Sequence, residues 1–213
     1  MDALGMALKG SQFMNQELKF DEAKHEYTVG DRRLHSVTQI CKFAYPDAYS
    51  EIPEKMKQFY FSRGTGVHKL CEDAENGVDG QFTYDPEVEK YRAGHAKWLK
   101  DTGFRALPGG IEMRVKNLDL GYAGTVDRLG TVGQRVWLVD LKTSSVKDAP
   151  TSLQLALYLL AIPGYKFGEV ERYGVAIKKD GTYQMSRRYP DSDEQDAIYW
   201  ASKFKEARHD AAC

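Results

Sequence analysis

The run Leu138–Ser144, which reads LVDLKTS, decides how this sequence is interpreted. Its apolar residues predict a β-strand, in which alternate side chains point to opposite faces. Asp140 and Lys142 therefore share one face of a strand that is otherwise apolar. A buried charge is costly unless it is paired or binds a metal. These two charges indicate either an ion pair on a surface strand or a functional site.

The overall composition is that of an ordinary soluble globular protein. The chain has 213 residues, of which 42% are hydrophobic and 29% charged, and this length suits one domain with a real core. The net charge is −1 and the pI about 6.5. A nucleic-acid partner must therefore be held by a local basic groove or by metal ions, not by a generally cationic surface.

Cysteine usage and the N-terminus point to a cytoplasmic protein. Cys41, Cys71 and Cys213 lie far apart and form no Cys-x-x-Cys pair, so a zinc knuckle, an iron–sulfur cluster and a disulfide framework are not expected. The first residues lack the apolar core of a signal peptide, and no run approaches the ~18 apolar residues of a membrane helix. We therefore expect no membrane partner.

Hydrophobic periodicity and turn residues predict an α/β fold with a central mixed β-sheet flanked by helices. Residues 1–16 are read as a flexible tail or a short helix, and they are followed by a hairpin that turns at Gly30–Asp31 and a helix that begins at about Val37. The later predicted elements are helices over 53–77 (with a break near Gly64–Gly66) and 85–103, strands over 110–117, 120–130 and 135–144, a helix over 152–162, strands over 169–179 and 182–189, and a helix over 191–210 whose apolar side is Ala197, Ile198, Ala201 and Phe204.

A second aspartate interrupts the neighbouring predicted strand. If residues 128–136 form a hairpin turn, strand 121–129 pairs with strand 135–143, and Asp127 can lie near Asp140. Two close carboxylates repel each other unless a cation lies between them. Oxygen ligands of this kind suit Mg²⁺ or Mn²⁺. With Lys142 beside the ion to position a water, the unit has a mechanism, which is metal-assisted hydrolysis of a phosphodiester.

Three further features support a site over a surface ion pair, although two of them, His68 and Glu112, have a structural alternative. His68 follows the glycine-rich turn RGTG, but a lone histidine is more often structural. Gln154 and Tyr158 share one face of an apolar helix, where a buried glutamine needs a partner. Glu112 is an extra acid on the strand next to Asp127, or else a residue that faces solvent.

The chain contains four motifs in the order Gly-Thr-Gly-x-His (64–68), Gly-Thr-x-Asp (124–127), Val-Asp-Leu-Lys-Thr (139–143) and Gln-x-x-x-Tyr (154–158). Together they resemble the RecB-type branch of the PD-(D/E)XK nuclease superfamily. That branch includes the nuclease domain of RecB, the CRISPR-associated RecB-like exonucleases and the mitochondrial genome maintenance exonucleases. The segment LHSVTQI (34–40) also resembles the last of these groups. The resemblance covers about residues 35–160.

The resemblance implies a restriction-endonuclease-like core and a role for each motif residue. His68, Asp127, Asp140 and the Leu141 carbonyl would bind one or two Mg²⁺ or Mn²⁺ ions. Lys142 would orient or activate the attacking water, and Gln154 and Tyr158 would support it. The sequence departs from the family pattern in three ways. Val126 stands where the superfamily has its proline, the cysteines of an iron–sulfur cluster are missing, and no helicase domain is present, so unwinding would need a helicase or recombination partner.

Substrate contacts are harder to identify, because cations and aromatic residues along a groove look the same in sequence as ordinary solvated surface. The residues that we predict to contact DNA are Ser36, Thr38, Arg63, Thr143, Lys178, Lys179, Arg187 and Arg188.

Together these observations predict that residues 1–213 form a single nuclease domain, with a catalytic core at 35–160 and a late hairpin and helix at 168–213. The expected activity is that of a metal-dependent DNA exonuclease acting in recombination, repair or degradation in a bacterial or phage-infected cell. Its substrate would be single-stranded DNA or DNA with a free end. The alternatives are an endonuclease and a catalytically inactive module that keeps the fold and binds nucleic acid or protein.

Overall fold

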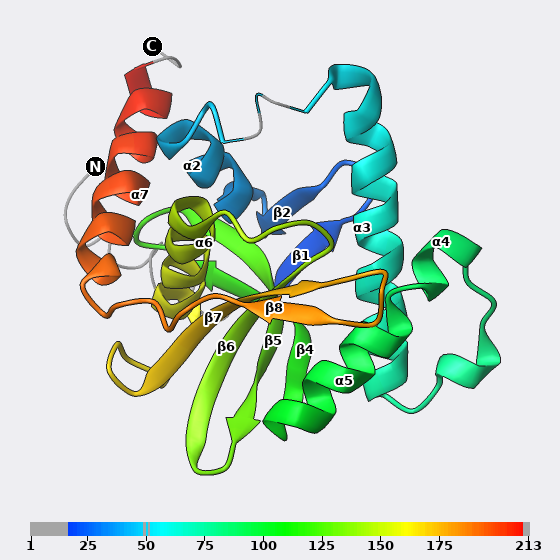
Figure 1. The fold of residues 1–213 in the computed structure, drawn as a ribbon. Coiled ribbons are helices and arrows are strands. Elements are labelled where there is room, and N and C mark those ends of the chain that lie inside the picture. Colours follow the sequence, from blue (N-terminus) through cyan, green and yellow to red (C-terminus); the bar gives the residue numbers. More distant parts are fainter. Residues whose placement is uncertain (1–16, 49, 51, 211–213) are drawn as a thin grey trace.

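The computed structural model describes residues 17–48, 50 and 52–210 and shows the predicted α/β architecture, a mixed eight-stranded sheet flanked by helices (Figure 1). The strand order is β1-β2-β3-β5-β6-β7-β8, and β4 pairs with β5. The strands are β1 Leu18–Asp21, β2 Glu26–Val29, β3 Arg32–Ser36, β4 Arg105–Asn117, β5 Tyr122–Val132, β6 Arg135–Lys142, β7 Val170–Ile177 and β8 Tyr183–Met185.

Helices cover both faces of this sheet. One apolar core lies between the sheet and helices α2, α6 and α7, and a second lies between the sheet and α3, α4 and α5. No helix in the described part of the chain has the length and apolar character needed to cross a bilayer. The helices are α2 Val37–Ala44, α3 Glu54–Glu75, α4 Pro86–Glu89, α5 Arg92–Thr102, α6 Asp148–Ala161 and α7 Asp193–Asp210, with a short 3₁₀ turn at Asp79–Gln81.

The sheet splits along one edge of β5. Strand β3 pairs in parallel with the start of β5, and this ladder ends at Ser36–Ala123. Strand β6 pairs antiparallel with the end of β5, and that ladder begins at Arg128–Val139. Between them, residues 124–126 of β5 pair only with β4 on the opposite edge, and Asp127 follows them directly. The split therefore falls on the Gly-Thr-x-Asp motif.

Helix α6 packs closely over the start of this split. A Cβ atom added to Gly124 would lie 2.6 Å from Cε1 of Tyr158 and 3.1 Å from Cγ2 of Val37. Only glycine leaves room for the tyrosine ring here. The glycine of this motif thus has a packing role, because it lets α6 approach β5.

The N-terminal segment and α3 differ from the predicted elements. The predicted hairpin and its Gly30–Asp31 turn are present, but β1 adds a third strand. The predicted break near Gly64–Gly66 is wrong, because α3 runs unbroken through both glycines. Gly66 is needed for packing there, since its Cβ would lie 2.9 Å from Val88 Cγ2.

Two predictions for the later helices also need correction. The helix predicted over 85–103 is two helices, because the N–H of Tyr91 bonds to the carbonyl of Val88, three residues back, and interrupts the α-helical ladder. Ile198 does not belong to the apolar side of α7, since it is 43% exposed. The buried residues Ala197, Ala201 and Phe204 follow the i, i+4, i+7 pattern, and Ile198 lies one position off it.

Candidate active site

Helix α3 brings His68 against the carboxyl end of β6. Its Nε2 lies 3.0 Å from the Leu141 carbonyl oxygen. Its Nδ1 lies 3.4 Å from Oε1 of Glu112 and 3.6 Å from Oδ1 of Asp127. One imidazole from a helix, two carboxylates from neighbouring strands and one backbone carbonyl therefore meet at a single point.

Asp127 sits inside the split of the sheet. Its Oδ2 accepts a hydrogen bond of 2.7 Å from the backbone N–H of Leu141, so the side chain replaces a backbone partner that β5 does not provide. Continued by one residue, the β5–β6 register places Asp127 opposite Asp140, as the hairpin prediction requires. Its other oxygen, Oδ1, faces His68.

Asp140 and Lys142, the two charges of LVDLKTS, are paired with each other. Lys142 Nζ lies 2.6 Å from Oδ2 of Asp140, which is only 1% exposed. The lysine also donates to Oε1 of Gln154 at 3.2 Å, and Gln154 Nε2 donates to the Tyr158 hydroxyl at 3.2 Å. The alternative of a surface ion pair is therefore wrong, because Asp140 is buried and Lys142, whose side chain is 24% exposed, is also bonded to Gln154 of α6.

Glu112 reaches the site through an irregularity in β4. Residues 107–110 of β4 stand opposite the single residue Leu129 of β5, and such bulges bend a strand and redirect its side chains. Glu112 follows with a φ of +46°, a left-handed conformation that is unusual for a residue with a side chain. The result is that Glu112 faces His68 and is only partly exposed to solvent.

Burial shifts the pKa values of the two aspartates in this site upward. Burial raises the pKa of Asp140 to about 6, although Lys142 opposes the shift. Burial also raises the pKa of Asp127, and the nearby Glu112 adds to this. Burial alone would lower the pKa of His68, but Asp127 and Glu112 outweigh it and raise the pKa to about 9. A protonated His68 thus supplies positive charge where the carboxylates meet.

The residues at this point fit a divalent cation. Donor atoms of His68, Glu112 and Asp127 all lie within 4.8 Å of one another, and carboxylate and carbonyl oxygens with one imidazole suit Mn²⁺ or Mg²⁺. Asp140 lies outside this three-residue cluster and beside it, held by Lys142. The structure therefore brings all the predicted site residues into one region but divides them into an acidic cluster and a lysine-centred cluster.

Two of the residues predicted to contact DNA lie next to this region. The Tyr91 hydroxyl donates to the Thr143 carbonyl at 3.4 Å, and the Arg63 guanidinium lies over the Tyr91 ring, 5.9 Å from its centre. Arg63 also lies 4.9 Å from the Tyr60 ring centre. Thr38 is exposed on α2, whereas Ser36 is buried and its hydroxyl caps α2 by accepting from the N–H of Gln39.

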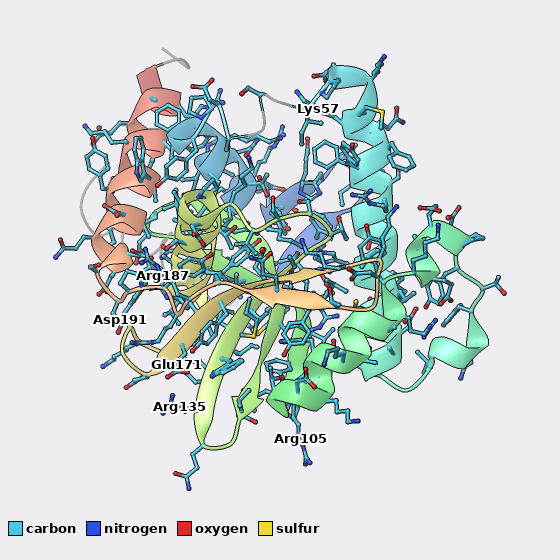
Figure 2. All side chains as sticks on the ribbon, in the orientation of Figure 1. Lys57, Arg105, Arg135, Glu171, Arg187 and Asp191 are labelled. Atoms are coloured by element: carbon cyan, nitrogen blue, oxygen red, sulfur yellow. The ribbon has the colours of Figure 1, made fainter. Side chains whose placement is uncertain are left out.

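The four predicted cations of the late hairpin lie at opposite ends of β8. Lys178 and Lys179 precede the strand at the turn beside α5, and Lys179 pairs with Glu87 of α4 at 2.6 Å. Arg187 and Arg188 follow the strand, and Arg188 pairs with Asp191 at 2.7 Å. Figure 2 shows Arg187 on the side of the molecule that carries α7, far across the view from Lys57 on α3. These cations do not form one groove.

Sequence reasoning missed a buried arginine directly behind the acidic cluster. Arg128 donates to Oε1 of Glu75 at 2.6 Å and to Oε1 of Glu112 at 3.2 Å. A signal was present in the sequence, because Arg128 interrupts an apolar strand just as Asp140 does. The same argument about buried charge would have selected it.

Comparisons with known proteins agree with the motifs. The family model of the PD-(D/E)XK nuclease superfamily matches residues 36–208, while no curated protein matches. Among solved structures, a candidate exonuclease from Eubacterium rectale is similar over 80% of this chain and 77% of its own, with 14% identity and a TM-score of 0.51. An alkaline exonuclease from Laribacter hongkongensis matches with 13% identity over 83% of this chain and 92% of its own, at a TM-score of 0.41.

At 14% identity the Eubacterium rectale structure shows a shared fold only, and it is the family match, over most of the chain, that decides the assignment. The chain belongs to the PD-(D/E)XK nuclease superfamily.

Proposed function

We propose that this protein is a divalent-metal-dependent DNA exonuclease of the RecB type. One observation carries the proposal, namely that the side chains of His68, Glu112 and Asp127 converge beside the Leu141 carbonyl while Lys142 is held next to them. The order of the four motifs supports the RecB-type branch. The proposal treats residues 1–213 as one domain, with the core at 35–160 and the extension at 168–213.

A bound Mg²⁺ or Mn²⁺ would offset charge on the phosphodiester and lower the pKa of the attacking water. The residues proposed to hold it are His68, Asp127, Asp140, the Leu141 carbonyl and, as a further acid, Glu112.

The lysine-centred cluster would position the reacting groups. Lys142 is anchored by Asp140 and Gln154, so its ammonium group has a fixed direction. There it can donate a hydrogen bond to the attacking water or to a phosphate oxygen, and its charge stabilises the negative charge that develops in the transition state. Tyr158 orients Gln154 through the hydrogen bond between them. Tyr158 itself stays protonated, because burial raises its pKa well above the ordinary value.

DNA is proposed as the substrate, single-stranded or with a free end. Among the predicted contact residues, Thr143 directly follows Lys142, Arg63 lies near the Tyr91 ring whose hydroxyl donates to the Thr143 carbonyl, and Thr38 is exposed on α2. Arg63, held over the Tyr60 ring, provides a cation and an aromatic face together, the combination that binds a nucleic-acid strand. The remaining predicted contacts, at Ser36, Lys178, Lys179, Arg187 and Arg188, are not needed for this proposal.

The test uses end-labelled single-stranded, double-stranded and circular DNA, incubated with the protein in Mg²⁺, Mn²⁺ or EDTA. We expect linear DNA to be degraded only with a metal ion, and circular DNA to be spared. Asp140→Asn and Lys142→Ala should each slow cleavage by on the order of 10²-fold or more. Cleavage of circular DNA would indicate an endonuclease. A wild-type protein that binds DNA and cleaves none would indicate the inactive module, and variants as fast as wild type would contradict the assigned site.

A further inference from the structure

A second group of charges lies behind the acidic cluster, entirely inside the protein. Its centre is Arg128, whose side chain is 0% exposed. The guanidinium donates through Nε to Glu75 at 2.6 Å, and through one terminal nitrogen to Glu112 at 3.2 Å and to the Asp127 carbonyl at 2.6 Å. Arg128 thus contacts the residue before it in β5, the acid of β4 and the end of α3 at once.

Glu75 connects this arginine to the two helices on that face of the sheet. It is the last residue of α3, the helix that carries His68, and its Oε1 lies 3.0 Å from Nε2 of His95 on α5. The side chains of Glu75 and His95 are 6% and 2% exposed. The chain of contacts from His95 through Glu75 and Arg128 to Glu112 therefore joins two helices to the bulged strand.

Glu112 is the member of the acidic cluster that most needs such support. It has a left-handed backbone conformation, which persists only where surrounding contacts enforce it. The same carboxylate oxygen, Oε1, faces Arg128 at 3.2 Å and His68 at 3.4 Å. Arg128 therefore lies directly behind the atom that would face a metal ion.

We propose that Arg128 is a positioning residue that fixes Glu112 for metal binding and ties its position to the helix that carries His68. The proposal rests on the proposed function, since it assumes that these residues hold a divalent ion. The planar guanidinium holds two carboxylates at separate edges, a geometry that the single ammonium of lysine cannot reproduce. Residues that hydrogen-bond to metal ligands orient them in this way, and their loss weakens metal binding about 10- to 100-fold.

A purely structural role is the competing explanation, and Arg172 provides the matched control for it. Arg172 is also 0% exposed and lies in β7, where it donates to the Pro190 carbonyl at 2.6 Å and lies 3.7 Å from Asp193. Within the described part of the chain, the hydrogen bond, ion pair and ring contact of Arg172 go to Pro190, Asp193 and Phe167, none of which is a proposed metal ligand. Loss of a buried arginine destabilises the fold at either position, but only Arg128 touches Glu112.

The experiment measures Mn²⁺ binding to the full chain by calorimetry, without DNA, for wild type, Arg128→Lys, Arg172→Lys, Glu112→Gln and the double variant of Arg128→Lys with Glu112→Gln. Thermal unfolding is followed in parallel. We expect Arg128→Lys to weaken Mn²⁺ binding about 10- to 100-fold and Arg172→Lys to leave it unchanged, whatever the change in melting temperature. In the Glu112→Gln background, Arg128→Lys should add little further loss, because the arginine acts through that glutamate.

If Arg128→Lys does not fold, Glu75→Gln is the second variant, because it keeps an acceptor for Arg128 and removes one charge. It should weaken Mn²⁺ binding by a smaller factor in the same direction. Unchanged binding in Arg128→Lys, or in Glu75→Gln where that variant replaces it, overturns the proposal, as does equal loss in Arg172→Lys or full additivity with Glu112→Gln. A wild type that binds Mn²⁺ but cleaves no DNA defeats only the proposed function. A wild type that binds no Mn²⁺ defeats both.

Discussion

The acidic cluster and the lysine-centred cluster stand side by side but differ in how they balance charge. His68, Glu112 and Asp127 bring two carboxylates to one imidazole, which is protonated because its pKa is raised to about 9. Asp140 and Lys142 instead form a one-to-one ion pair that Gln154 completes. An added cation would offset the remaining negative charge of the first cluster, whereas the ion pair of the second cluster is already neutral. We therefore expect that substitutions can impair metal binding and the role of Lys142 in cleavage separately.

The largest expected effect is on the acidic cluster. Asp127→Asn keeps an acceptor for the Leu141 N–H but removes the charge, so Mn²⁺ binding and DNA cleavage should both fall, cleavage by about a thousandfold or more. Calorimetry and end-labelled DNA measure the two effects. Asp119→Asn, at an exposed position, is the control and should match wild type. Retained Mn²⁺ affinity in Asp127→Asn would remove this residue from the metal site.

A substitution in the lysine-centred cluster should reduce cleavage and leave Mn²⁺ binding nearly intact. Lys142→Ala removes the charge that we propose stabilises the transition state, so cleavage should slow by on the order of 10²- to 10³-fold. Mn²⁺ affinity should stay within about threefold of wild type, because the three-residue cluster is intact. Lys203→Ala, which breaks the surface pair with Glu206, is the matched control. Loss of metal binding in Lys142→Ala would mean that the two clusters act as one unit.

The third prediction uses pH to test the charge of His68. Because its pKa is about 9 in the metal-free protein, binding of Mn²⁺ must displace a proton below that pH. Affinity should rise up to about tenfold per pH unit between pH 6.5 and 9, with proton release visible as a dependence of the binding heat on the buffer.

The stability of the metal-free protein should fall as the pH rises, whereas its Mn²⁺ affinity increases. A histidine whose folded pKa lies above its unfolded value of 6.5 contributes stability that is present below pH 6.5 and lost as pH rises through 9. Melting temperature without metal should therefore fall over this range, apart from other titrating groups, and His68→Gln should flatten the change. An Mn²⁺ affinity that does not vary with pH would contradict a protonated His68.

The smallest expected effect concerns an exposed aromatic residue on α3 that could stack on the bases of the substrate. Phe61 is 66% exposed and lies seven residues before His68 in α3, which puts the two on the same side of the helix. If bases stack there, Phe61→Ala should raise KM for single-stranded DNA about tenfold, since stacking contributes about 1–3 kcal/mol per base. The value of kcat and the Mn²⁺ affinity should not change. Phe82→Ala, at another exposed phenylalanine, is the control. Equal effects of the two substitutions would rule out a specific stacking position.

Much of this site could be predicted from the sequence, because its residues are chemically conspicuous. Asp127, Asp140 and Lys142 stand out as charges in apolar strands, and the hairpin between their strands follows from local turn residues. Gln154 and Tyr158 stand out as polar residues in an apolar helix, and the structure joins them by a hydrogen bond.

The features that escaped prediction depend on contacts between distant segments. The bulge that turns Glu112 toward His68 depends on the register of β4 against β5, which local sequence does not specify. The network of Arg128, Glu75 and His95 joins a strand to two helices far away in sequence. The cations of the late hairpin looked like one cluster because they are close in sequence, yet β8 separates them.

The hydrogen bond from Leu141 N–H to Asp127 also has a dynamic consequence. It fastens one carboxylate oxygen to the backbone of β6 and leaves the other to face His68. Lys142 is the next residue along that backbone, so a thermal displacement of β6 carries the carboxylate and the lysine together. The distance between a bound ion and the lysine would then vary less than the position of either one. Thermal motion of the strand would thus shift the catalytic groups as a unit and preserve their alignment.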